Sequence, residues 1–197
     1  MKKLKKMIIG SVLSLSLFGF HSHADAATNY QVKSGDTFWK IASRFGVTVG
    51  TLKNTNDRTS NMLYAGESIS IPASTISFAD KDLMARLVQA EAKGESYAGK
   101  VAVATVILNR MDHPDFPNTV KGVIYQIDGG YYAFTPVKNG TIYNPAGSEA
   151  KRAVNEALAL RGVGKGSIYF YNPKTAVSSW IFSRPVTTKI GNHVFAR

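Results

Sequence analysis

The residue whose setting best fits chemistry is Glu91, a carboxylate at the end of an apolar helical stripe. Residues 83–95 predict an amphipathic helix, because Leu83, Leu87 and Glu91 are spaced four residues apart and therefore share a face. A carboxylate on a core-facing stripe is costly unless it is paired, solvated in a cleft or protonated. The last two conditions describe a general acid, whose pKa a partly apolar wall raises toward working pH. The alternative is a helix that turns to solvent at its end and leaves Glu91 an ordinary surface charge.

The flanking residues predict where this helix begins and ends. Ser77-x-x-Asp80 resembles a capping box at its start, and Gly94 fits a C-cap at its end. These boundaries put Glu91 in the last turn, at the rim of a cleft.

Thiol and metal chemistry have little support in the composition. The chain has no cysteine, which excludes a disulfide framework and a thiolate nucleophile. A catalytic zinc site would depend on histidine, and two of the four histidines, His21 and His23, fall in a segment that we expect to be removed. We therefore expect no metal and no cofactor.

The N-terminus has the pattern of a secretory signal peptide. Four lysines precede the apolar run 7–20, and Ala24-Asp25-Ala26 offers a cleavage site between small residues. We expect residues 1–26 to be cleaved off. The alternative, an uncleaved membrane anchor, would need a longer apolar run, and no later run reaches spanning length. The expected product is secreted and has no stable membrane span.

The mature chain is strongly basic. Loss of four lysines and Asp25 from a chain of net charge +11 leaves a net charge near +8. Export, together with the lack of a basic block or a nucleic acid-binding motif, argues against nucleic acid as the partner. Anionic cell wall polymers, such as peptidoglycan carboxylates and teichoic acid phosphates, are the simpler partner. The alternative is that the charge only aids solubility.

The first mature module covers residues 27–73 and predicts a small βααβ unit. A strand at 30–32 is followed by helices at 38–45 and 49–55 and by a strand at 68–71. Gly35-Asp36-Thr37 predicts a turn with a helix N-cap, and Gly46 ends the first helix. We expect the two strands to pair antiparallel.

This module resembles the LysM domain over its whole length. The resemblance is carried by Tyr30-x-Val32-x-x-Gly35-Asp36-Thr37-Phe38-x-x-Ile41-Ala42, then Leu52, Asn56, Leu63, Gly66 and Ile69-x-Ile71-Pro72. It implies binding of glycans that contain N-acetylglucosamine, such as peptidoglycan or chitin, in a groove between two loops. The implied groove residues are Gly35, Asp36 and Thr37 on one side and Asn61, Met62 and Leu63 on the other. Asp36 equally fits a helix N-cap and Leu63 the core, and for Asn56 we favour a structural role.

A short polar linker, residues 74–77, leads to a mainly helical second module, residues 78–197. Its expected elements after the Glu91 helix are a buried helix at 101–108, a short helix capped by Asn118 and reaching Tyr125, a helix at 149–160, and strands at 167–171 and 193–195. The loop 128–147 is long enough to be functional.

Aromatic residues gather late in this module, interleaved with polar ones. Such a set can line a cleft that stacks on sugar faces and hydrogen-bonds to hydroxyl groups, or it can belong to the core. The candidate substrate-binding residues are Gln126, Phe134, Thr135, Tyr169, Tyr171, Asn172 and Ser183.

The second module is similar to the germination-type cell wall hydrolases, the SleB/CwlJ family. The similarity is carried by Ala90-Glu91-Ala92-Lys93-Gly94-Glu95, Val106-Ile107-Leu108-Asn109-Arg110, Phe116-Pro117-Asn118-Thr119-Val120, Ala133-Phe134-Thr135-Pro136-Val137, Tyr169-x-Tyr171-Asn172-Pro173 and Ser179-Trp180-Ile181-Phe182-Ser183-Arg184-Pro185. It implies a lysozyme-like fold that cleaves peptidoglycan glycan strands, with Glu91 as the catalytic acid. Residues 127–132 depart from the family pattern, which usually has a shorter Pro-Gly-type connection there.

The predicted fold class is α+β, with a βααβ LysM module and a lysozyme-like catalytic domain that has a few short strands. We expect a monomer associated with the cell wall, or with the spore coat and cortex. Three functions stay open: cleavage of glycan strands, an N-acetylmuramoyl-L-alanine amidase, and a wall-binding protein without catalysis.

The mechanism of strand cleavage depends on a second carboxylate. A two-carboxylate hydrolase needs a partner at about 5–10 Å from the acid. Glu95 lies four residues on but beyond Gly94, and Asp112, Asp115 and Asp128 fall in predicted turns. A single acid suits a lytic transglycosylase, in which the muramic C6 hydroxyl displaces the leaving sugar. We favour this mechanism, with a muramidase-type hydrolase as the alternative.

Overall fold

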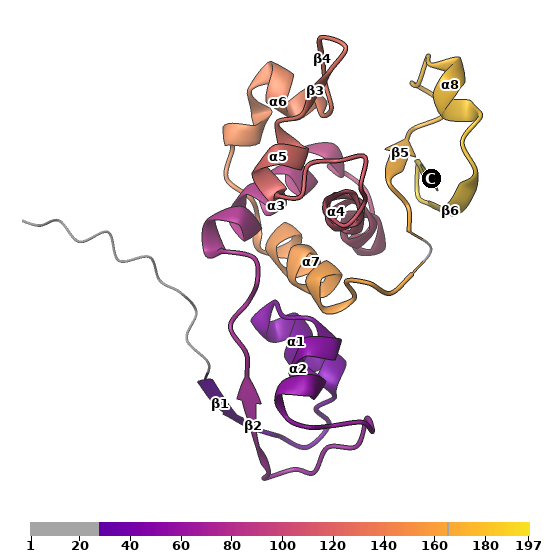
Figure 1. Ribbon diagram of the computed structural model, residues 1–197. Helices are drawn as coiled ribbons and strands as arrows, with labels where there is room; N and C mark the ends of the chain where they lie inside the picture. Colours follow the sequence, from indigo (N-terminus) through magenta and orange to yellow (C-terminus); the bar gives the residue numbers. More distant parts are fainter. Residues whose placement is uncertain (1–27, 165) are drawn as a thin grey trace, which may run out of the picture.

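The protein folds into an N-terminal α/β unit and a larger helical unit with a small sheet at one side (Figure 1). A computed structural model describes residues 28–164 and 166–197 of the 197-residue chain. The predicted signal peptide, residues 1–26, lies outside the described residues. The α+β fold class is confirmed. Within the described ranges no helix is both long enough and apolar enough to cross a membrane.

The N-terminal unit has the predicted βααβ order. It consists of β1 (Thr28–Gln31), α1 (Phe38–Phe45), α2 (Val49–Thr55) and β2 (Ser68–Ile71). The two strands pair antiparallel, with Tyr30 opposite Ile69, as expected. Apolar residues from both helices, from β2 and from the segments just after β1 and α1 form its core: Val32, Phe38, Ile41, Ala42, Val47, Leu52, Ile69 and Ile71.

Side-chain hydrogen bonds set the ends of these elements. Thr37, not Asp36, caps α1, because the Thr37 hydroxyl accepts from the backbone N–H of Lys40 at 3.1 Å while Asp36 accepts from Tyr30 and Lys33. Gly46 ends α1 with a left-handed φ of 62°, as expected.

The structural role of Asn56 is confirmed. Its amide group donates to the carbonyl oxygens of Leu52 and Ser70 at 2.8 and 2.7 Å, and its side-chain oxygen accepts from the Ser70 N–H. Asn56 therefore joins α2 to β2.

The helical unit is built around α4 (Tyr97–Met111), against which α3 (Phe78–Glu91), α5 (Val120–Ile124) and α7 (Ser148–Ala159) pack. Val103, Val106, Ile107 and Leu108 of α4 have no exposed surface, which confirms the predicted buried helix. Two shorter elements, α6 (Thr135–Asn139) and the 3₁₀ turn η1 (Thr141–Tyr143), complete the unit.

Two predicted caps in this unit are wrong by one or two residues. Thr119 rather than Asn118 caps α5, because its hydroxyl accepts from the Gly122 N–H at 3.0 Å. Ala92 is the C-cap of α3, and Gly94 follows with a φ of 85°. Glu91 is therefore the last residue of α3, in the last turn as predicted.

The C-terminal sheet has the antiparallel order β5-β7-β6, made of β5 (Tyr169–Tyr171), β6 (Val186–Ile190) and β7 (His193–Ala196). The strands predicted near 167–171 and 193–195 are confirmed. The short helix α8 (Ser179–Phe182), β6 and a hairpin of β3 (Ile127–Asp128) and β4 (Tyr131–Tyr132) were not predicted. The predicted loop 128–147 is also wrong as a loop, because it contains β4, α6 and η1.

The two units pack together through α1 and α7 (Figure 1). Ala159 at the end of α7 is buried in the same apolar cluster as the LysM-like core. Gly46, at the end of α1, lies so close to α7 that a Cβ there would be only 2.7 Å from the Asn155 side chain. The first unit is therefore held against the second by more than the linker.

Candidate active site

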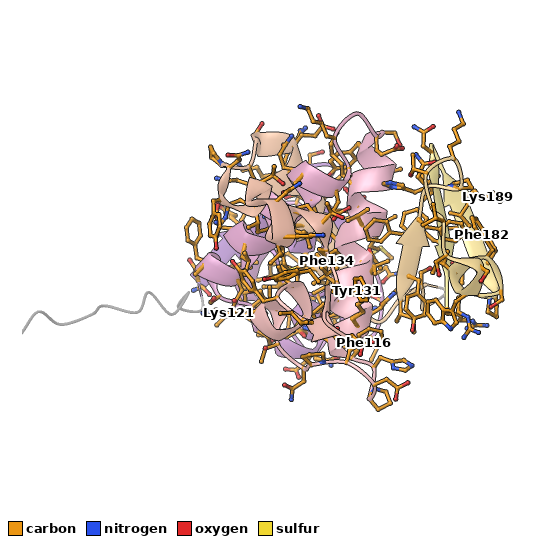
Figure 2. All side chains as sticks on the ribbon, turned by 90° about the horizontal axis from the view of Figure 1, so that it is seen from above. Phe116, Lys121, Tyr131, Phe134, Phe182 and Lys189 are labelled. Atoms are coloured by element: carbon orange, nitrogen blue, oxygen red, sulfur yellow. The ribbon has the colours of Figure 1, made fainter. Side chains whose placement is uncertain are left out.

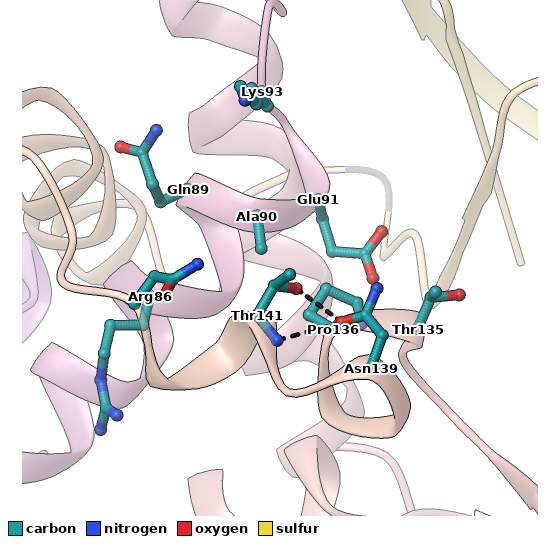
Figure 3. Close-up of a pocket in the computed structure, with 10 residues that line it drawn as sticks. Arg86, Gln89, Ala90, Glu91, Lys93, Thr135, Pro136, Asn139 and Thr141 are labelled. Carbon is teal, nitrogen blue, oxygen red and sulfur yellow. Dashed lines mark hydrogen bonds between the residues drawn. The ribbon is translucent and has the colours of Figure 1, made fainter.

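A pocket of about 510 Å³ lies where α3 ends and α6 begins, and Glu91 lines it (Figure 3). Residues of α3 form one wall, and residues of α6, η1 and the segment after η1 form the other. The lining residues are Arg86, Gln89, Ala90, Glu91, Lys93, Thr135, Pro136, Asn139, Thr141 and Asn144.

The packing of α3 explains the position of Glu91. Leu87 and Leu83, one and two turns earlier, are buried, so the same face brings Glu91 to the edge of the core. Figure 3 shows its carboxyl group pointing toward the side chains of Thr135 and Asn139.

Burial makes Glu91 a carboxyl group that can hold a proton near neutral pH. Removal from water raises its pKa from 4.5 to about 7, and the positive charge of Arg110 opposes this rise. A carboxylic acid with this pKa can donate a proton and, once ionised, accept one. Chemically, the position of Glu91 suits a general acid.

The wall opposite Glu91 is fixed by local structure. Pro136 lies in the first turn of α6, where backbone N–H groups have no partner within the helix, so the N–H that proline lacks costs no hydrogen bond. The helix ends at Gly140, whose φ is 81°. The Asn139 side-chain oxygen accepts from the backbone N–H and the hydroxyl of Thr141, at 3.0 and 2.8 Å. Two polar side chains of the wall are therefore held in place.

Sequence reasoning missed the polar residues beside Glu91. Arg86 and Gln89 of α3, and Lys93 just after this helix, line the pocket together with Glu91. The spacing of three residues between Arg86 and Gln89 was the signal that could have found the two on α3. Arg86 pairs with Asp82 at 3.1 Å, whereas Lys93 has no ion-pair partner in the part of the chain that the structure describes.

Among the residues that line this pocket, Glu91 is the one acid. Glu95 instead accepts from the side-chain amide and the backbone N–H of Asn192, at 2.9 and 3.1 Å, and the hydrogen bond from the Asn192 side chain is the main cause of its lowered pKa. Asp112 forms an ion pair with Arg161, and a carboxylate oxygen of Asp115 lies 3.7 Å from Nδ1 of His113. Within the described ranges, no group of three or more acidic or histidine side chains is placed to hold a metal ion.

Of the predicted substrate-binding residues, Thr135 lines the pocket beside Glu91. Phe134 is 3% exposed and packs in the core with Phe170. Tyr169 and Tyr171 lie on β5, where their rings pack edge-to-face with Trp180 and Phe182 of α8.

The other three candidates make local hydrogen bonds away from the pocket lining. The Asn172 side chain accepts from the Lys174 N–H at 3.0 Å, and the Ser183 hydroxyl donates to the Trp180 carbonyl at 2.7 Å. The Gln126 carbonyl accepts from the Ala133 N–H at the base of the β3–β4 hairpin. The structure thus brings Thr135, but not these three, to the pocket of Glu91.

The implied LysM groove residues lie on two loops of the first unit. Met62 is exposed, Leu63 packs partly on the core, and Asn61 accepts from the Lys53 ammonium group at 3.0 Å. On the other side, Gly35 takes a φ of 82°, Thr37 caps α1, and the Asp36 carboxylate accepts from the Tyr30 hydroxyl at 2.7 Å. The Asp36 carboxylate is therefore already hydrogen-bonded within the first unit.

Comparisons with known proteins agree with this division of the chain. Residues 94–196 match the family described as Cell Wall Hydrolase, a match that begins just after Glu91, and residues 30–72 match the LysM domain. The spore cortex-lytic enzyme of Halalkalibacterium halodurans is 48% identical over 116 residues, 59% of this chain and 34% of that protein. The cell wall hydrolase CwlJ of Bacillus subtilis is 32% identical over 128 residues, 59% of this chain and 84% of that protein.

A solved structure supports the same relationship. The catalytic domain of the germination-specific lytic transglycosylase SleB from Bacillus anthracis matches with a TM-score of 0.57 and 43% identity, over 64% of this chain and all of that one. The chain spans only 34–44% of the length of the spore cortex-lytic enzymes it matches. The chain therefore belongs to the Cell Wall Hydrolase family and carries a LysM domain ahead of its hydrolase domain.

Proposed function

We propose that this protein cleaves the glycan strands of peptidoglycan as a lytic transglycosylase, with Glu91 as both general acid and general base. The observation that carries the proposal is a partly buried carboxyl group, with a pKa of about 7, lining a pocket in which it is the one acid among the described residues. The relatives named as spore cortex-lytic enzymes support peptidoglycan of the spore cortex as the substrate.

The proposed reaction needs no second carboxylate. Glu91 donates its proton to the glycosidic oxygen while the bond from muramic acid C1 to that oxygen breaks, which frees the 4-hydroxyl of the leaving sugar. The ionised Glu91 then takes the proton of the muramic C6 hydroxyl as that oxygen bonds to C1. A 1,6-anhydro end forms, Glu91 regains its proton, and no water is consumed.

The other groups of the pocket suit a sugar ligand. Thr135 and Asn139 lie beside the carboxyl group of Glu91 and offer hydroxyl and amide groups to sugar hydroxyls (Figure 3). Lys93 adds positive charge, which favours a strand that carries carboxylates.

We further propose that the LysM domain holds the protein on peptidoglycan. Its implied groove residues Gly35, Thr37, Asn61 and Met62 are exposed at the surface of the first unit. A secreted protein bound to the wall or cortex, attracted also by anionic wall polymers, follows from this role.

Mass spectrometry of products formed in ¹⁸O-labelled water tests the reaction. A lytic transglycosylase gives 1,6-anhydro ends without ¹⁸O, because water does not enter the product. A two-carboxylate muramidase would give reducing ends that carry ¹⁸O, and an amidase would release peptides with free alanine amino groups. Either of these outcomes overturns the proposed reaction. Cortex and vegetative sacculi, digested in parallel, identify the preferred substrate.

A further inference from the structure

Arg110, in the last turn of α4, is a buried cation that packs on Phe134, the residue just before Thr135 of the candidate active site. It is 8% exposed, which is rare for arginine because removal of a charge from water is costly. Its Nε donates to the Ile168 carbonyl at 2.7 Å. In the described part of the chain no carboxylate forms an ion pair with it.

Three aromatic rings surround the guanidinium group of Arg110. Its central carbon lies 5.1 Å from the ring centre of Phe116, 5.0 Å from that of Phe134 and 5.7 Å from that of Tyr169. These rings come from the loop after α4, the start of α6 and β5, and Figure 2 shows Phe116 and Phe134 over the same side of the helical unit. The faces of aromatic rings attract a cation, so the three rings partly replace the lost water.

The contacts of Arg110 lead to the pocket of Glu91, because Phe134 packs on the guanidinium group and the next residue, Thr135, lines that pocket beside Glu91. Burial lowers the pKa of Arg110 to about 10, and the charges of Tyr169 and Glu91 oppose this change. In return, Arg110 lowers the pKa of Glu91, which burial raises. The groups that act on this pair therefore come from α3, α4 and β5, and at neutral pH Arg110 is the one that carries a full charge.

We propose that Arg110 is a positioning residue for Glu91, which offsets the negative charge that appears on the Glu91 carboxyl group when its proton passes to the glycosidic oxygen. The role rests on the proposed function of Glu91 as acid and base. Arg110 stays protonated throughout, and no bond to it forms or breaks. A fixed positive charge stabilises the ionised carboxylate but not the neutral acid. The effect is largest in a half-buried site, because little water is present there to solvate the carboxylate.

Asn109 offers a matched control for the structural part of this role. Its side-chain amide donates to the Ser167 carbonyl at 2.8 Å, next to the carbonyl bound by Arg110. Both residues therefore tie the end of α4 to the segment that leads into β5, but only Arg110 is charged. If Arg110 acts merely as a tie, Asn109→Ala and Arg110→Gln will have similar effects.

The direct test is titration of Glu91 by NMR in protein labelled with ¹³C at the glutamate carboxyl carbon, with Glu91→Gln to assign the signal. In wild type we expect a pKa of about 7 for Glu91. Arg110→Gln and Arg110→Met should raise this pKa by at least about one unit. Arg110→Lys, which keeps the charge, and Asn109→Ala should leave it near the wild-type value. Gln retains an amide donor for the Ile168 carbonyl, so at least one uncharged variant should fold.

The pH dependence of activity gives the second readout. The acid form of Glu91 starts the reaction, so the fall in kcat/KM at high pH should move upward in Arg110→Gln by the same amount as the titration. Its kcat should fall about tenfold or more, with little change in KM. Folded Arg110→Gln and Arg110→Met proteins with an unshifted Glu91 would overturn this proposal while leaving the proposed function intact. If wild type forms no anhydro products, the proposed function fails, and the titration still decides the role of Arg110.

Discussion

Glu91 combines two properties that oppose each other, because the burial that makes it a proton donor near neutral pH also makes its charged form costly. A group whose pKa is higher in the folded than in the unfolded chain binds more protons when folded. Between its unfolded pKa of 4.5 and its folded pKa of about 7, rising pH therefore reduces stability, and above pH 7 the full cost is present. A functional site of this kind is expected to reduce stability.

This cost gives a prediction for Glu91→Gln. The variant should be more stable than wild type at pH 8, by at most about 3 kcal/mol, because the amide cannot ionise. At pH 4, where both states hold the proton, the two proteins should unfold alike. Urea unfolding at both pH values checks this prediction. A variant that is less stable than wild type at pH 8 would mean that the Glu91 carboxylate is well solvated or paired.

At the scale of elements, the β3–β4 hairpin leads directly into α6, which forms one wall of the pocket. Its second strand contacts α6, while Tyr131 and Tyr132 remain 79% and 45% exposed. Figure 2 shows Tyr131 over the helical unit. Exposed aromatic rings next to a sugar site are suited to stacking on a longer glycan strand.

We therefore predict that Tyr131→Ala combined with Tyr132→Ala raises KM for long glycan strands about tenfold and changes the turnover of short fragments little. Phe78→Ala is the control, since Phe78 is 75% exposed at the opposite end of α3. Steady-state kinetics on glycans of graded length provides the measurement. Equal losses on short and long substrates would argue against a separate binding role for the hairpin.

The sequence predicted the local features of the fold but not the contacts between distant residues. The stripe of Leu83, Leu87 and Glu91 is local, so its helix and the position of Glu91 in the last turn follow from spacing alone. Other contacts of the hydrolase domain join distant residues: Arg110 and Ile168 are 58 residues apart, and Glu95 and Asn192 are 97 apart. No local pattern encodes such pairs. The cap at Asn118 was misplaced, and Asp36 could not be separated from Thr37 as a cap, because the neighbouring threonines Thr119 and Thr37 offer the hydroxyl in the required geometry.

In the whole molecule, the LysM domain packs directly against the hydrolase domain, through the contact of α1 with α7. The two units bury a shared face, so removal of the LysM domain would expose apolar surface around Ala159. Single substitutions in the full chain are therefore a cleaner test of targeting than truncation. Met62 is suitable, since it is 59% exposed and lies in the implied glycan groove.

We predict that Met62→Glu lowers the fraction of protein that sediments with insoluble peptidoglycan and slows the digestion of sacculi by roughly tenfold. Tethering raises the local concentration of the catalytic domain without adding chemistry, so the rate on soluble glycan fragments should be unchanged. Val177→Glu adds the same charge at an exposed position of the other domain and should sediment as wild type does. Undiminished sedimentation of Met62→Glu would exclude this groove as the binding site.

The measurement that tests the central claim most directly is the rate of anhydro-muropeptide formation by Glu91→Gln, with Glu95→Gln as the matched control. Gln cannot donate a proton, and one residue serves both steps, so Glu91→Gln should lose at least about 10²–10⁴-fold in rate while remaining folded. Glu95 holds Asn192 and does not line the pocket, so Glu95→Gln should lose far less. A folded Glu91→Gln protein that still forms anhydro ends at near the wild-type rate would contradict the account.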